Sequence, residues 1–142
     1  MSASADISQG VTAAVITEPL PDLQLQFLIQ LLDREARSSL PITLTLAGGI
    51  LHGDVIGHEE WKADWARSLR QVEGEGANLL AEFPETVDQG LGEIGAATDQ
   101  GLPRWIHLRD VTLSFGTVSP VSLALWRGRL ADVTGWSLGR PQ

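Results

Sequence analysis

The sequence contains no cysteine, which excludes disulfide bonds and thiolate metal sites. No apolar run approaches the roughly 20 residues that a membrane-spanning helix needs. The first ten residues, MSASADISQG, lack the basic start and the long apolar run of a secretory signal. We therefore expect a cytoplasmic protein without a membrane partner.

Basic residues are absent from a long stretch in the middle of the chain. The formal net charge is −8, and residues 71–103 hold seven acidic residues but no lysine or arginine. Five arginines lie from residue 104 onward. Because so acidic a surface repels phosphate backbones, we expect no nucleic-acid partner.

The length of 142 residues suits one domain of common size. Residues 1–21 are small, polar and aperiodic, so we expect a disordered or extended tail. Asp22 is a suitable N-cap for a helix over residues 23–38, whose apolar stripe includes Leu25, Leu28 and Leu32. We expect this helix to cover one open end of a sheet; the alternative is that it docks on a partner.

A hairpin is predicted over residues 41–57, PITLTLAGGILHGDVIG. Apolar and polar residues alternate up to Gly48-Gly49, a pair that permits a two-residue turn. The return strand carries Gly53 at its middle, where a glycine permits a sharp bend. A bent hairpin with one apolar face needs further strands to complete a core.

Strand character returns at residues 105–115, WIHLRDVTLSF, whose two apolar phases a bulge near Arg109-Asp110 reconciles. Residues 121–129 alternate again, and residues 135–138 form a last short strand. We predict that residues 22–142 form one α+β domain, a small, strongly bent five-stranded antiparallel barrel capped by the N-terminal helix. The expected interior residues are Leu44, Leu46, Val55, Leu123 and Leu125.

Residues 58–103 are predicted to form a helical, acidic insertion after the second strand. Trp61, Trp65 and Leu69 share one face of a helix over residues 58–72. The two tryptophans either pack in the ordinary way or anchor an interface, because tryptophan is enriched at interface hot spots.

Recognised signatures of catalysis are missing. His52, His58 and His107 have no known metal-site spacing, although His58-Glu59 offers possible ligands. The letters G-x-G-x-x-G at residues 90–95 follow no strand and open no βαβ unit. We therefore predict no enzyme, no catalytic residue, no cofactor and no metal.

A basic patch is predicted on the late strands. Arg127 and Arg129 are two residues apart, so they point to the same face of a strand, and Arg109 is expected to join them from the neighbouring strand. This patch is either a solvated sheet face or a docking surface for acidic insertions of other copies or for an acidic partner.

Two family resemblances rest on these segments. LTLAGGILHGDVIG, IHLRDVTL and LALWRGRL resemble strands of the Sm-like fold, a helix followed by a bent five-stranded barrel. The insertion replaces the short loop that bears the RNA-binding residues of Sm proteins, so only Arg127-Gly128 corresponds to an RNA contact. This resemblance implies the alternative of an Sm-like RNA-binding protein.

The second resemblance is closer. GGILHGDVI, IHLRDV and WRGRLADVTGWSLG are similar to the gas vesicle accessory protein family GvpU. This resemblance implies a cytoplasmic, non-enzymatic protein that acts in vesicle clustering or at the vesicle surface, with the shell or other gas vesicle proteins as partners. We expect a homo-oligomer, with Trp61, Trp65, Arg109, Arg127 and Arg129 as interaction residues.

Overall fold

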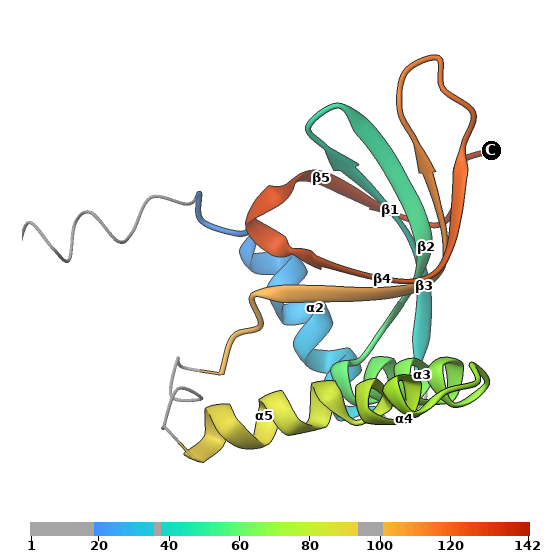
Figure 1. Ribbon diagram of the computed structural model, residues 1–142. Helices are drawn as coiled ribbons and strands as arrows, with labels where there is room; N and C mark the ends of the chain where they lie inside the picture. The colour runs from blue at the N-terminus through green and yellow to red at the C-terminus, as the bar shows by residue number, and fades with distance from the viewer. Residues whose placement is uncertain (1–18, 36–37, 94–100) are drawn as a thin grey trace, which may run out of the picture.

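The computed structural model describes residues 19–35, 38–93 and 101–142 (Figure 1). Within these residues the chain forms four α-helices, five strands and one 3-10 turn, η1. In order these are α2 (Leu23–Arg34), β1 (Ser39–Leu46), β2 (Gly49–Ile56), α3 (His58–Arg70), α4 (Glu75–Ala81), α5 (Phe83–Glu93), β3 (Trp105–Ser114), β4 (Val121–Arg129), η1 (Leu130–Asp132) and β5 (Val133–Leu138). Most of the predicted N-terminal tail lies outside the described residues.

The five strands form one antiparallel sheet in the order β4-β3-β2-β1-β5. Successive strands are neighbours up to β4, and β5 then returns to pair with β1. The predicted α+β class, the bent five-stranded sheet, the N-terminal helix and the helical insertion after the second strand are confirmed. The sheet is not a closed barrel, because β4 and β5 leave η1 in diverging directions and do not pair in the described chain (Figure 1).

The sheet bends where Gly53 of β2 faces β3. The register shifts there, so that Gly53 lies opposite both Asp110 and Val111. Asp110 adopts a φ of 53°, and a Cβ atom added at Gly53 would lie 3.0 Å from the carbonyl oxygen of Arg109. The predicted bulge at Arg109-Asp110 is therefore confirmed, and it allows Leu108 and Val111 to point into the same core.

The inner face of the bent sheet holds the core. Its ten buried apolar residues are Leu25, Ile29, Ile42, Leu44, Leu51, Val55, Ile106, Leu108, Val111 and Leu130. Two of them come from α2, which closes one end of the sheet as predicted. Asp22 caps this helix, because its Oδ1 atom accepts a hydrogen bond from the Leu25 N–H at 3.1 Å.

Most of the expected interior residues face this core. Leu44 and Val55 are fully buried, and Leu46 and Leu123 pack against the cluster. The expectation for Leu125 is wrong, because it pairs with Arg109 on the outer face of the sheet. The alternation along β4 changes phase at the bend, which the spacing of Leu123 and Leu125 alone does not reveal.

The hairpin turn lies one residue earlier than predicted. Ala47 and Gly48 form the turn, Gly48 has a φ of 85°, and Gly49 already pairs with Leu46 as the first residue of β2. Gly49 is needed for another reason, since a Cβ atom there would lie 2.4 Å from the Phe115 ring.

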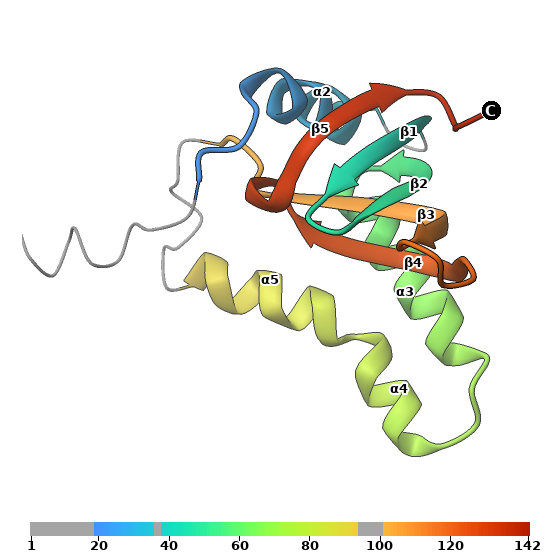
Figure 2. The same ribbon diagram turned by 90° about the horizontal axis from the view of Figure 1, so that it is seen from above.

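The helices cover two different sides of the sheet. Figure 2 shows α2 on one side and α4 and α5 on the other. The start of α3 is tied to the end of α2, because the His58 N–H donates to Asp33 Oδ1 at 3.0 Å. Gln26 of α2 donates to the Pro103 carbonyl at 2.8 Å and so holds the segment that returns from the insertion. None of the helices in the described residues is both apolar enough and long enough to cross a bilayer.

Replacing Gly49 with alanine is expected to lower the free energy of unfolding by about 1–3 kcal/mol, because the added methyl collides with Phe115 and with the Ser114 carbonyl. Urea unfolding followed by circular dichroism measures this loss. Gly90→Ala is the control, since a Cβ at Gly90 meets no atom within 4 Å and alanine favours helix. Equal midpoints for the two variants would contradict the packing argument.

Candidate functional site

Helix α3 lies against the outer face of β3 and β4 and is anchored there by ion pairs. Arg109 Nη1 lies 3.3 Å from Glu60 Oε1 and 3.3 Å from Asp64 Oδ2. Asp64 is only 8% exposed and also binds Arg67 at 2.7 Å. Arg109, predicted as an interaction residue, therefore holds α3 on the sheet.

Trp61 lies between α3 and the sheet. It is 7% exposed, and its ring lies 4.9 Å from that of His107 and 5.4 Å from that of Trp65. Its Nε1 atom is buried and has no hydrogen-bond partner in the described residues. Trp65 is half-buried and donates its Nε1–H to the Leu80 carbonyl at 2.7 Å, which attaches α4 to α3. Trp61 thus packs between α3 and the sheet, while Trp65 links α3 to α4.

Arg127 is a cation on the outer face of β4, opposite His107 of β3. Its guanidinium carbon lies 3.9 Å from the centroid of the Trp105 ring, and its Nε–H donates to His107 Nε2 at 3.3 Å. Within the described chain no carboxylate forms an ion pair with Arg127. Arg129 lies on the same face, as predicted, and forms an ion pair with Asp132 at 2.8 Å. Arg127 is therefore held in orientation by Trp105 and His107 and forms no ion pair with a described carboxylate.

Helices α4 and α5, with the loop that precedes them, form the acidic arm (residues 71–93). Lys62, the only lysine of the chain, binds this arm to α3. Its Nζ atom lies 2.5 Å from Glu85 Oε2, 2.8 Å from Asp88 Oδ2 and 2.7 Å from Glu59 Oε2. Burial lowers the pKa of Lys62, but the hydrogen bonds to Asp88, Glu59 and Glu85 outweigh burial and raise this pKa above its ordinary value. The ammonium thus stays charged and balances the carboxylates around it.

His58 joins the arm to the sheet. Its Nε2 atom lies 2.8 Å from Asp88 Oδ2, and its Nδ1 atom lies 3.3 Å from His107 Nε2. Burial raises the pKa of Asp88, but the hydrogen bonds from Lys62 and His58 outweigh it and lower this pKa. Asp88 is therefore an ionised acceptor, and we assign a proton to His58 Nε2.

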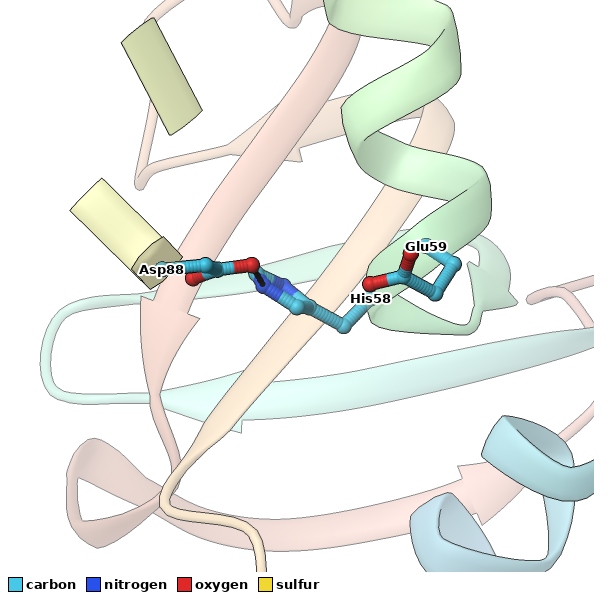
Figure 3. Close-up of side chains that lie close together, drawn as sticks. All are labelled: His58, Glu59 and Asp88. Carbon is cyan, nitrogen blue, oxygen red and sulfur yellow. Dashed lines mark hydrogen bonds and ion pairs between the residues drawn. The ribbon is translucent and has the colours of Figure 1, made fainter. Parts of the chain in front are cut away.

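The same groups include a possible set of metal ligands. One ligand atom each of His58, Glu59 and Asp88 lies within 4.8 Å of the others, and Figure 3 shows the His58 ring with Asp88 on one side and Glu59 on the other. The ammonium of Lys62 contacts both carboxylates, however. It supplies the positive charge that a metal ion would bring, so the donor set does not fit a metal site well.

Two cavities flank this network. One of about 140 Å³ lies between α3, α5 and β4 and is lined by His58, Trp61, Trp65, Phe83, Pro84, Val87, Asp88 and Arg127. The other, of about 230 Å³, lies between α3 and the start of the arm and is lined by Glu59, Lys62, Ala63, Ala66, Ala81, Glu82, Pro84 and Glu85. Neither wall contains a hydroxyl or thiol nucleophile, and the first is mostly aromatic and aliphatic, which suits binding through contact.

Of the five predicted interaction residues, the structure brings Trp61, Trp65 and Arg127 together. Arg129 lies beside them on β4, whereas Arg109 forms ion pairs with Glu60 and Asp64 of α3. Sequence reasoning missed Trp105, His107, Lys62 and Asp88. A signal existed for three of them, because residues 105 and 107 of a strand share a face and the only lysine, Lys62, follows Trp61 in the sequence.

The fold and the site define a small α+β protein with an aromatic and cationic surface on the outside of its sheet, covered in part by an acidic helical arm. Residues 22–141 match the model of the GvpU-like family, which is described as gas vesicle protein GvpU-like. The chain therefore belongs to this family. The predicted resemblance to GvpU is confirmed, and the family is one of gas vesicle accessory proteins. No curated protein and no solved structure matches the chain, so the resemblance to the Sm-like fold stays a prediction, although the sheet itself is not closed.

Burial, together with the charges of His58 and Arg127, lowers the pKa of His107 from 6.5 to about 3. The unfolded chain therefore binds a proton at this ring below about pH 6.5, which the folded chain does not bind until about pH 3. The free energy of unfolding is expected to fall by up to about 1.4 kcal/mol per pH unit as the pH is lowered through this window.

Urea unfolding of the His107→Gln variant between pH 5 and pH 7 tests this pH dependence, because the glutamine side chain does not titrate. The variant is expected to lose this part of the pH dependence. His52→Gln, on β2 away from α3, serves as the control and should keep it. An unchanged slope in His107→Gln would show that another group causes the acid sensitivity.

Proposed function

We propose that this protein is a non-enzymatic gas vesicle accessory protein that works in the cytoplasm through protein–protein contacts, in vesicle clustering or at the vesicle surface. Its partners are the shell or other gas vesicle proteins, and it works as a homo-oligomer. The family supports the gas vesicle context. The observation that carries the contact role is Arg127, stacked on Trp105 and without a carboxylate partner in the described residues.

Arginine and tryptophan are the residues that most often dominate protein interfaces. Trp105 is 41% exposed, so the Arg127–Trp105 pair is accessible on the outer face. A guanidinium held by a ring and by His107 loses little conformational freedom when it binds a carboxylate, which favours an acidic partner surface. Arg129 extends the same face and adds to the attraction during encounter.

The double variant Arg127→Glu, Arg129→Glu is expected to reduce the amount of protein that floats with purified gas vesicles at least about fivefold, because it replaces attraction with repulsion. Raising the salt concentration should weaken the binding of the unmodified protein in the same assay. Arg34→Glu with Arg67→Glu makes the same change in net charge elsewhere and should leave flotation unchanged.

Equal flotation of both double variants would contradict the role of this face, provided that thermal melts show both folded. Filter binding with RNA is run in parallel. Micromolar or tighter RNA affinity, with no flotation, would favour the alternative of an Sm-like RNA-binding protein.

A further inference from the structure

Helix α5 lies in a groove that it fills only in part. The α5 groove is formed by His58, Trp61, Lys62 and Trp65 of α3 and by Arg127 of β4. Phe83 and Val87 of α5 lie on its wall, yet they remain 54% and 39% exposed. The cavity of about 140 Å³ remains between these side chains and the sheet.

The contacts that hold α5 in place are mainly ionic. Lys62 binds Glu85 at 2.5 Å and Asp88 at 2.8 Å, and His58 binds Asp88 at 2.8 Å. The groove thus recognises a helix with two apolar residues four positions apart and with carboxylates beside them, which is an acidic amphipathic helix. Helix α5 is itself a helix of that kind.

Two features of the groove are used only in part by α5. Arg127 forms no ion pair in the described chain, although Asp88 of α5 attracts its charge, and the cavity lacks an apolar side chain to fill it. An empty apolar space forgoes packing. A helix with a longer apolar residue and one more carboxylate would bind this groove better than α5 does.

We propose that the α5 groove binds an acidic amphipathic helix of a partner protein, which replaces α5. The inference rests on the proposed function in protein contacts and names the chemistry of the partner. Among the described contacts, the ion pairs to α3 and the packing of the half-exposed apolar residues must separate for α5 to leave. Because α5 is tethered, it competes at an effective concentration on the order of millimolar, and the partner helix must bind tightly enough to overcome this.

A labelled peptide of residues 75–91 of this chain serves as the probe, with fluorescence anisotropy as the readout. It is added to the full-length protein and to the full-length variant Glu85→Gln, Asp88→Asn, in which α5 loses its ionic contacts. We expect the variant to bind the peptide roughly fivefold more tightly or better, because its groove is freed. A peptide that carries the same two substitutions should bind it weakly.

The control protein is Glu73→Gln with Glu75→Gln, which changes the net charge equally at arm residues that form no ion pair in the described chain. It should bind the peptide no better than the unmodified protein. Adding Arg127→Gln or Trp65→Ala to the freed variant should weaken binding again, because both residues line the groove. Equal binding to all proteins, or no binding to the freed variant, would overturn the proposal.

The flotation assay separates this proposal from the proposed function. Peptide binding to the freed variant, with gas vesicle flotation insensitive to Arg127, would support the groove and reject the vesicle-contact role of this face. Flotation that depends on Arg127, with no peptide binding to the freed variant, would reject the helix site and leave the proposed function in place.

Discussion

The bend at Gly53 and Asp110 is the constraint on which the rest of the structure depends. A flat β3 would place Leu108 and Val111 on opposite faces, because side chains alternate along a strand. The bulge brings both into the core and leaves His107 and Arg109 pointing outward. The outer face can then bind α3, since Arg109 meets Asp64 and His107 meets Trp61. One irregular position thus produces both the core and the platform on which the insertion rests.

Charge then arranges the insertion on this platform. The arm carries no basic residue of its own, so its carboxylates must find cations elsewhere. Lys62 and His58 at the start of α3 meet Glu85 and Asp88, and Arg70 near the end of α3 meets Glu82 at 2.6 Å. Helix α3 therefore forms ion pairs on two sides, with its acidic Glu60 and Asp64 toward Arg109 of the sheet and its basic residues toward the arm. Arg127 is a cation on this face that forms no ion pair with a carboxylate in the described residues.

Local pattern predicted most of the fold. Alternation, the glycines and the Asp22 cap led to the hairpin, the bulge, the N-terminal helix and the position of the insertion, because each depends on neighbours in sequence. The site depends on register and on long-range contacts instead. Nothing near Asp88 indicates that it meets His58, 30 residues away, and pairing of Trp105 with Arg129 follows only from the register of β3 and β4. The predictions for Gly49 and Leu125 were wrong for the same reason. Gly49 is constrained by Phe115, which is distant in the sequence, and Leu125 faces outward because β4 changes phase at the bend.

The hydrogen bond from the His58 backbone to Asp33 has a consequence for cooperativity. It joins the first turn of α3 to the last turn of α2, which places Leu25 and Ile29 in the core, so these two helices and the sheet should open together as one unfolding unit. In the part of the chain that the structure describes, helices α4 and α5 have no such backbone tie to the core, and we expect them to form a separate unit with less protection. The arm would then sample open states while the remainder of the molecule stays native. Amide exchange would show this as a change from strong to weak protection at the loop after α3.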